Sequence, residues 1–382
     1  MRAPLIALLC ATMFTSIFWQ GAFPALLPDL GRSAGLADWQ LGTLAGAFGF
    51  ARMVADIPVG LFITHHLRRA LVLSPLLLAA GVLCLAGGGP FAVLVLGRAL
   101  MGVGHALSVV AGLTAILRYQ SGGVLASALS AFELSAMLGI LGGTVLLGLL
   151  PADLPWNVAL LLICAPQALG VLMVPFVLAA LPVEPPGATR PLFARPARSA
   201  SAPVTALVVL AFAAGGVIAT SYSTLEQFIV PLRADREFGL ARTGIARLLM
   251  IVQLCDIICL LPAGGMLADR RGAARVLGLM LLVFGAGEGL VAFGDFAALV
   301  AGCALFGVGM AAWTLPLSLV RRETPADHVG WRTALYRVGV DAGVFLGPFL
   351  SGFLAGGRSR LFAGVLALLL MLIGVVLLRR RP

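Results

Sequence analysis

Lysine is absent from the 382-residue sequence, so all 26 basic residues are arginine. A nucleotide-binding P-loop needs a lysine to reach the phosphates, and we therefore expect no ATP hydrolysis within this chain. Charged residues of any kind make up only 11% of the sequence, whereas 60% of the residues are hydrophobic. These proportions lie far outside the range of an ordinary soluble domain and leave no room for a sizeable soluble catalytic domain.

Spacings typical of metal or disulfide sites are also lacking. The six cysteines all lie within apolar runs, where we interpret them as small packing residues. Cys255 and Cys259 are four residues apart and share a helix face, which leaves thiol or metal chemistry open there. We predict no metal, no other cofactor and no enzymatic activity.

Twelve apolar runs follow one another along the chain, each close to the roughly 20 residues that a membrane-spanning helix needs. The first run is too long for a signal peptide, and we predict an all-α membrane protein with twelve transmembrane helices. The runs are Leu5 to Leu27, Leu41 to Ile63, Ala70 to Gly87, Phe91 to Leu117, Val124 to Leu150, Trp156 to Leu181, Val204 to Leu232, Thr243 to Ala268, Ala274 to Phe293, Phe296 to Val320, Ala334 to Gly356 and Leu361 to Leu378.

A segment rich in proline, serine and alanine separates two sets of six runs. We predict an N-terminal six-helix bundle over residues 1–181, a linker over 182–203 and a C-terminal six-helix bundle over 204–382. The net charge of +10 comes from arginines in short segments between apolar runs, which indicates membrane topology rather than nucleic-acid binding.

The arginines predict the orientation of the chain. Most of them follow an even number of runs, so the positive-inside rule places the linker and both termini in the cytoplasm. Arg233, Arg236 and Arg242 lie on the opposite side and weaken this bias without reversing it. Abundant alanine and glycine, with arginine in place of lysine, are typical of a GC-rich bacterial genome, and we expect a bacterial inner membrane.

One motif occurs at the end of the second run and again at the end of the eighth. The second copy reads Gly-Met-Leu-Ala-Asp-Arg-Arg-Gly from Gly265, and the first begins at Gly60. This motif resembles the G-x-L-A-D-R-x-G signature of the major facilitator superfamily, whose two pseudo-symmetric six-helix bundles are related by an axis along the membrane normal. The motif residues that the resemblance identifies as a gate are Gly60, Thr64, Gly265, Asp269, Arg270 and Gly272.

The residue types in this motif each indicate a structural role. Glycine lets helices approach closely, the aspartate caps a neighbouring helix, and the arginines hold the boundary of the membrane. Thr64 stands where the second copy has Asp269, so we expect an uncharged cap and a weaker gate in the first half.

The fourth run contains Arg98, Gly102 and His105, which share one helix face. The sequence from Arg98 to Gly102 is similar to an R-x-x-x-G motif that this superfamily associates with proton coupling. Arg98 and His105 are expected to point into one cavity, although His105 is equally compatible with a packed, neutral core residue. The Gly347-Pro348 step of the eleventh run is similar to drug and metabolite transporters, but the fifth run has no such pair, which leaves export open.

Several ionisable residues lie within apolar runs, where an unpaired charge is costly. Arg52 with Asp56, and Arg337 with Asp341, have the spacing of ion pairs within one helix. The superfamily fold packs the second helix against the eleventh, which makes an exchangeable gate between the bundles the alternative to static pairing.

Carboxyl groups are the expected proton carriers. Glu133 in the fifth run and Asp256 in the eighth lie at similar depths without an adjacent arginine, and burial favours the neutral form of a carboxyl group. Glu226 and Glu288 lie nearer the outer ends of their runs, so we rank them second and favour an interfacial or solvated place. Trp19 and Trp313 are candidates for the lining of a substrate cavity.

These observations predict a monomeric secondary transporter that moves a small organic solute, a drug or a metabolite, by alternating access. Protons are the expected coupling ion, and the partners are the solute, protons and lipid, without nucleic acid. An importer or a uniporter of the same fold is the first alternative. A membrane sensor on this scaffold is the second, and the absence of a large soluble signalling tail disfavours it.

Overall fold

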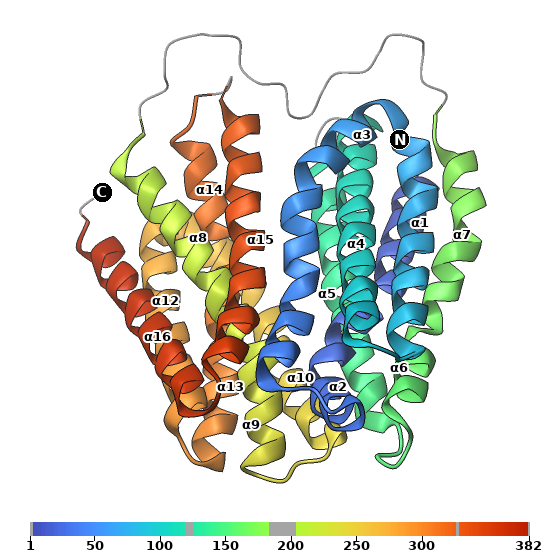
Figure 1. Cartoon of the computed structure of the whole chain (residues 1–382). Coiled ribbons are helices and arrows are strands. Elements are labelled where there is room, and N and C mark those ends of the chain that lie inside the picture. The colour runs from blue at the N-terminus through green and yellow to red at the C-terminus, as the bar shows by residue number, and fades with distance from the viewer. Residues whose placement is uncertain (1–2, 120–124, 183–203, 326–327, 381–382) are drawn as a thin grey trace.

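The computed structural model describes residues 3–119, 125–182, 204–325 and 328–380 as helices joined by short turns (Figure 1). Residues 183–203, which hold nearly all of the predicted linker, lie outside this part of the chain. No strand occurs among the residues described, as expected for an all-α membrane protein.

The N-terminal half contains seven helices, because two of the six predicted transmembrane runs are each broken once, whereas α3 contains both the second and the third run. The first run breaks at Ile17 and the sixth at Ala165. The helices are α1 (Ala3–Ser16), α2 (Phe18–Ala34), α3 (Asp38–Ala86), α4 (Phe91–Tyr119), α5 (Leu125–Leu149), α6 (Trp156–Cys164) and α7 (Pro166–Ala180).

The C-terminal half contains two π-helical segments, η2 and η3. Pro231 lies two residues beyond η2, and Pro262 lies within η3; proline lacks an amide hydrogen and its ring clashes with the preceding turn, which disturbs the α-helical hydrogen bonds. The segments are α8 (Ala206–Thr224), η2 (Leu225–Ile229), α9 (Val230–Arg236), α10 (Arg242–Cys259), η3 (Leu260–Leu267), α11 (Ala268–Arg271), α12 (Ala273–Phe293), α13 (Phe296–Met310), α14 (Leu315–Arg322), α15 (Val329–Leu354) and α16 (Gly356–Arg379).

Ten helices of the described chain are long and apolar enough to cross a membrane, or eleven when the bent segment from α10 to α11 counts as one span. Helix α3 has 49 residues and would extend about 74 Å, more than twice the thickness of the hydrocarbon core. His66 interrupts it with non-helical torsion angles, so α3 makes two crossings. The total is the twelve crossings predicted from the hydropathy pattern.

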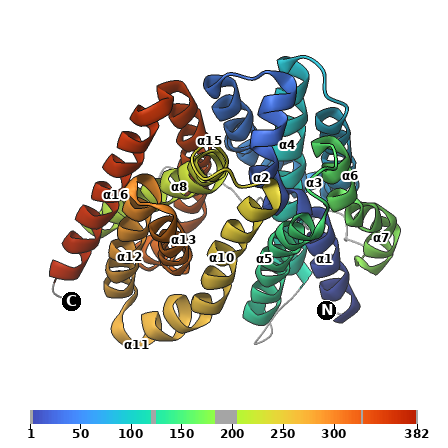
Figure 2. The same cartoon turned by 90° about the horizontal axis from the view of Figure 1, so that it is seen from below.

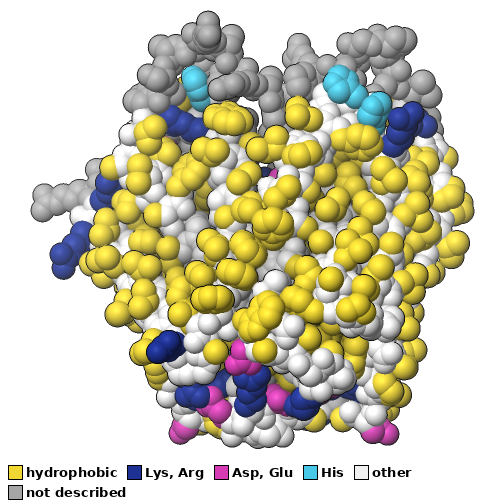
Figure 3. Space-filling model, in the orientation of Figure 1, with side chains coloured by type: hydrophobic (Ala, Val, Ile, Leu, Met, Phe, Trp, Pro, Cys, Tyr) yellow, Lys and Arg dark blue, Asp and Glu magenta, His cyan; other side chains and the backbone are white. Residues whose placement is uncertain are grey.

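We call the end that holds His66 and Tyr119 the inner end, and the end that holds Gly35 and Gly294 the outer end. In Figure 3 the inner end is at the top; apolar side chains cover the middle of the molecule, and charged side chains gather towards both ends. This band matches the surface that a protein presents to a bilayer.

The two halves lie side by side (Figure 2) and meet where α3 packs against α15 and α5 packs against α10. Helices α3 and α15 approach closely in their outer halves because three glycines of α3 face α15. A Cβ atom on Gly42 would lie 2.4 Å from the Pro348 carbonyl oxygen, and one on Gly46 would lie 2.8 Å from that of Phe345. Gly49 makes the third such approach, at 2.6 Å from the Phe345 nitrogen, so these three positions of α3 favour glycine.

Candidate functional site

Four charged side chains lie between α3 and α15, directly inward of the glycine contacts. Arg52 pairs with Asp341 at 2.7 Å, and Arg337 pairs with Asp56 at 3.5 Å. Each ion pair therefore joins the two bundles, rather than two residues of one helix as their sequence spacing allows. We call these four residues the central charge cluster.

The central charge cluster is electrically balanced and its carboxylates are buried. The side chains of Asp341 and Asp56 are 1% and 7% exposed, whereas those of Arg52 and Arg337 are 17% and 27% exposed. A buried ion pair gains stability only while both partners stay together, because either charge alone is costly. Rocking of the bundles that separated α3 from α15 would thus require new partners for these groups.

A cavity of about 200 Å³ opens inward of the central charge cluster. Asp56 and Arg337 form its floor together with apolar side chains from α3, α4 and α15. The lining residues are Asp56, Ile57, Leu61, Val110, Trp331, Ala334 and Arg337. The bundles are therefore in contact at the outer end and separated at the inner end.

The second interface, between α5 and α10, brings together Glu133 and Asp256. The charge of Glu133 acts on Asp256, and Asp256 Oδ1 is buried without a hydrogen-bond partner among the described residues. The Glu133 side chain itself is exposed. Arg337 and Arg52 act electrostatically on Glu133, so the fold supplies the nearby arginines that its sequence neighbours do not.

Glu226 is buried, contrary to the interfacial or solvated place that the sequence favoured. It lies in η2 and is 2% exposed, with Tyr222, Gln253 and Asp256 as its polar and charged neighbours. The error has a physical cause, since depth along a helix does not say which face the neighbouring helices cover. Glu288 on α12 is 0% exposed, so the expectation of an interfacial or solvated place is wrong for this residue too.

The Glu226 group reaches across to the N-terminal bundle. Tyr222 neighbours Gln20 of α2, and the Tyr222 ring lies 5.9 Å from that of Trp313. Gln253 is 7% exposed, and neither its oxygen nor its nitrogen has a hydrogen-bond partner in the described residues. Unfilled hydrogen-bonding capacity beside aromatic rings is typical of a site that receives a polar organic solute.

Arg98 lies inside the N-terminal bundle and does not face the cavity described above. It is 1% exposed, and its guanidinium stacks on Phe23 with 3.7 Å between the guanidinium carbon and the ring centre. Trp19 and Phe48 are the other two rings near this cation, at 5.3 Å each. His105 packs against the same two rings, so Trp19 is a wall of this aromatic enclosure.

The gate motif is only partly engaged in this structure. Thr64 Oγ1 donates to the Gly60 carbonyl of its own helix, so its side chain does not cap a neighbouring helix as expected. Asp269 is exposed and lines a pocket with Arg321 and Arg322 of α14, and it makes no ion pair among the described residues.

The glycines of the motif also depart from expectation. A Cβ atom on Gly265 would meet nothing within 4 Å, whereas one on Gly264 would lie 2.4 Å from the Ala311 carbonyl oxygen. Gly264 therefore provides the close helix approach. Gly272 has φ +90°, a conformation that favours glycine, and allows the turn between α11 and α12, after the basic residues Arg270 and Arg271.

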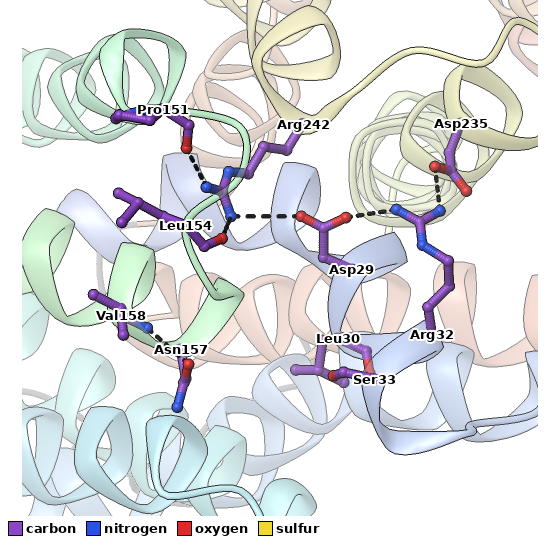
Figure 4. A network of polar contacts seen from close by, with 10 residues as sticks. All are labelled: Asp29, Leu30, Arg32, Ser33, Pro151, Leu154, Asn157, Val158, Asp235 and Arg242. Atoms are coloured by element: carbon purple, nitrogen blue, oxygen red, sulfur yellow. Dashed lines mark hydrogen bonds and ion pairs between the residues drawn. The ribbon is translucent and has the colours of Figure 1, made fainter.

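A network of charges closes the outer end (Figure 4). Arg32 pairs with Asp235 in the opposite bundle and with Asp29 at 2.6 Å. Arg242 approaches Asp29 at 3.6 Å and donates to the carbonyl oxygens of Pro151 and Leu154. These contacts join α2 and the loop after α5 to the C-terminal bundle.

A further ion pair, Arg236 with Asp38 at 2.6 Å, completes this closure. The outer arginines that weakened the predicted orientation are thus partners of outer carboxylates. We did not predict this network or the glycine series on α3. The spacing of Gly42, Gly46 and Gly49 at one helix face is the sequence signal that identifies the latter.

Two matches to one family model cover residues 8–230 and 211–382, and the family is described as the Major Facilitator Superfamily. The chain belongs to the Major Facilitator Superfamily. The two matches overlap over residues 211–230, so the first extends into α8 and η2. Membership assigns a transport role rather than an enzymatic one.

Relatives and solved structures agree with this assignment. The chain is 28% identical over 153 residues to the quinolone resistance protein NorA of Staphylococcus aureus, a match that spans 37% of this chain and only 38% of the relative. Structural neighbours include the peptide transporter POT (TM-score 0.78, 15% identity, 98% and 93% of the two chains) and the nucleoside transporter NupG (0.73, 13%, 99% and 100%). A bacterial homologue of the human lysosomal transporter Spinster, solved inward-facing and unoccupied, superposes with a TM-score of 0.74 at 13% identity over 99% of this chain and 97% of its own.

Proposed function

We propose that this transporter exports a small organic solute in exchange for protons across a bacterial inner membrane, with both termini in the cytoplasm. The observation that carries the proposal is the position of Asp256, a partly buried carboxyl group that lies between Glu133 of the other bundle and Glu226. Its Oδ1 atom has no hydrogen-bond partner among the residues that the structure describes. Such a group is stable when neutral and becomes free to release its proton when the interface opens to water.

The bundles alternate around the central charge cluster. In the structure the outer network and the glycine contacts are closed and a cavity lies inward of the cluster; under this proposal that cavity faces the cytoplasm and receives the solute from there. Binding near Tyr222, Gln253 and Trp313 would place the solute beside the Asp256 carboxyl group, where solute and proton compete for one site. Opening at the outer end then releases the solute and admits a proton.

Export rather than import is supported by the relative named for quinolone resistance, because a transporter that confers resistance does so by removing the compound from the cell. We extend this from a match over less than two fifths of the relative's length, so a quinolone is a first probe for this chain. We infer a single chain as the working unit, since both halves of the site come from one polypeptide.

Purified protein in liposomes containing a pH-sensitive dye tests the proposal, with a quinolone and a library of metabolites as solutes. We expect a solute-dependent change of internal pH, reduced at least tenfold in Asp256→Asn and unchanged in Asp153→Asn, an exposed loop carboxylate that serves as control. Solute flux without a proton signal in the unmodified protein would instead establish a uniporter, and a gradient-driven uptake would establish an importer. No flux with any solute would contradict transport and favour a sensor.

A further inference from the structure

The central charge cluster has a second set of ion-pair partners besides the set that the structure shows. In the structure the pairs are crossed between the bundles, with Arg52 of α3 on Asp341 of α15 at 2.7 Å and Arg337 of α15 on Asp56 of α3 at 3.5 Å. Along each helix, however, the arginine and the aspartate are four residues apart. Arg52 therefore also lies one turn from Asp56, and Arg337 lies one turn from Asp341.

Both helices keep their helical backbone through the cluster. Helix α3 runs from Asp38 to Ala86, and its non-helical torsion angles lie at His66, inward of the cluster. Helix α15 runs from Val329 to Leu354. Residues four apart on an α-helix have Cβ atoms about 5–6 Å apart, a separation that an arginine side chain spans. Pairing within each helix thus needs a rotation of side chains and no change of the backbone.

The cluster lies at the boundary between the closed and the open part of the interface. On its outer side a Cβ atom on Gly49 would lie 2.6 Å from the Phe345 nitrogen, and the Phe50 and Phe345 rings are 5.3 Å apart. On its inner side the cavity of about 200 Å³ touches Asp56 and Arg337. Separation of the outer halves of α3 and α15 would therefore pull the crossed partners apart.

The two crossed pairs are unequal. The Arg337–Asp56 pair is the longer one, and neither Asp56 oxygen has a hydrogen-bond partner among the described residues. Arg337 lines the cavity and its side chain is 27% exposed, which gives it room to turn towards its own helix. The Arg52–Asp341 pair is shorter, and the Asp341 side chain is 1% exposed. We expect the exchange of partners to begin at the pair that faces the cavity.

We propose that the central charge cluster is a switch with two positions, in which the ion pairs exchange partners as the bundles rock. The crossed pairs form while the outer end is closed, and the pairs within α3 and within α15 form when it opens. Each buried charge has a partner in both positions, so unpaired charge does not oppose either end state. Between the two positions the pairs are broken, which favours two discrete states over a gradual movement.

Exchanging charges between positions tests the switch. Arg52→Asp/Asp341→Arg keeps both crossed pairs attractive but places like charges four residues apart on each helix, so it should hold the outer end closed. Arg52→Asp/Asp56→Arg keeps the pairs within each helix attractive but makes both crossed pairs repulsive, so it should open the outer end. Exchange at all four positions, which adds Arg337→Asp, restores both sets of pairs and should behave as the unmodified chain.

The dipolar coupling between two spin labels reports the opening of the outer end in the purified full chain. The labels are attached through Trp39→Cys on α3 and Phe353→Cys on α15, whose side chains are 51% and 71% exposed, after the six native cysteines are replaced by alanine. The ratio of open to closed molecules should fall about tenfold in the first exchange and rise about tenfold in the second. No solute or proton gradient is present, so a failure here is distinguishable from a failure of the proposed export.

Glu133 is the rival partner, because Arg52 and Arg337 also act on this exposed carboxylate of α5. Glu133→Gln added to each protein should leave the pattern of couplings in place. Arg337→Asp/Asp341→Arg makes the second exchange on α15 and replaces the α3 variant if thermal unfolding shows that the latter does not fold. A shift in the same direction in both double exchanges, no recovery in the fourfold exchange, or loss of the pattern with Glu133→Gln would overturn the proposal.

Discussion

The two bundles share a fold, but they differ in the buried ionisable groups that make no ion pair among the described residues, with Arg98 in the N-terminal bundle and Glu226 and Glu288 in the C-terminal bundle. The N-terminal bundle encloses Arg98 among aromatic rings, with its nearest acceptors the carbonyl oxygens of Leu44 and Ala45 at 3.4 Å. The C-terminal bundle encloses Glu226 and Glu288, which lack full hydrogen bonding, and it presents Asp256 at the interface. A guanidinium does not release its proton in proteins, whereas a buried carboxyl group readily gains one.

This difference separates two tasks. Under the proposed function, the N-terminal bundle holds a permanent positive charge at Arg98, and the C-terminal bundle holds the carboxyl groups that exchange a proton. Under the proposed function the proton therefore moves through the C-terminal half. The central charge cluster lies between the two bundles, where each ion pair joins a residue of one bundle to a residue of the other.

The largest effect is expected from breaking the central charge cluster. Arg52→Ala leaves Asp341 buried without its ion-pair partner, and we expect a loss of about 3–5 kcal/mol of stability. The double variant Arg52→Ala/Asp341→Ala should recover much of this loss because no unpaired charge remains. Thermal unfolding of both variants in detergent checks the pair, and equal destabilisation of the two would show that the crossed pairing does not matter.

A change at Arg98 should have the opposite sign on stability. Arg98→Met keeps a long side chain in the aromatic enclosure and removes a buried cation that has no carboxylate partner in the described part of the chain, so we expect a gain of about 1–4 kcal/mol of stability. Transport should fall in the same variant if the positive charge of Arg98 is required for function. A less stable Arg98→Met protein would mean that the aromatic rings stabilise the cation more than burial costs it.

Helix approach at the outer end gives the third prediction. A methyl group on Gly46 would clash with the Phe345 carbonyl oxygen, and Gly46→Ala should destabilise the outer-closed arrangement by about 1–3 kcal/mol. Spectroscopic distances between labels at the outer ends of α3 and α15 report the closure. Gly216→Ala, where nothing lies within 4 Å, is the control, and no outward shift in Gly46→Ala would contradict the role of the glycine series.

The smallest effect is expected at the exposed rim of the outer network. The Arg32 side chain is 58% exposed, so Arg32→Ala should cost at most about 1 kcal/mol, because water screens the pairs with Asp29 and Asp235. Arg242→Ala should lower the stability by more, because the Arg242 side chain is only 1% exposed and also donates hydrogen bonds to two loop carbonyl groups. Thermal unfolding of the two variants measures the loss of stability in each. Equal losses would mean that the exposed ion pairs of Arg32 stabilise the closed outer end as much as buried Arg242 does.

The fold could be predicted from the sequence because each apolar run and each copy of the motif lies within a short stretch of chain. The local sequence is enough to recognise the twelve apolar runs, the break between the halves and the second copy of the motif. The charges within the membrane are legible in the same way, and all four members of the central charge cluster were singled out.

What the sequence did not determine is the rotation of each helix and the identity of its neighbours. The pairing of Arg52 with Asp341 instead of Asp56 depends on how α3 and α15 turn towards each other. Burial of Glu226 and Glu288 depends on which faces α10 and α13 cover. The outer network joins residues about 200 positions apart, such as Arg236 and Asp38, and no local pattern predicts such a pair.

The assignment of the proton to the C-terminal half is tested most directly by comparing Glu226→Gln/Asp256→Asn with Arg98→Met in liposomes. Both the solute-driven change of internal pH and the exchange of labelled for unlabelled solute are measured in each protein. We predict that the double variant loses the pH change but still exchanges solute, whereas Arg98→Met keeps a proton signal in proportion to whatever transport it retains. A pH change that persists in the double variant and disappears in Arg98→Met would contradict the account.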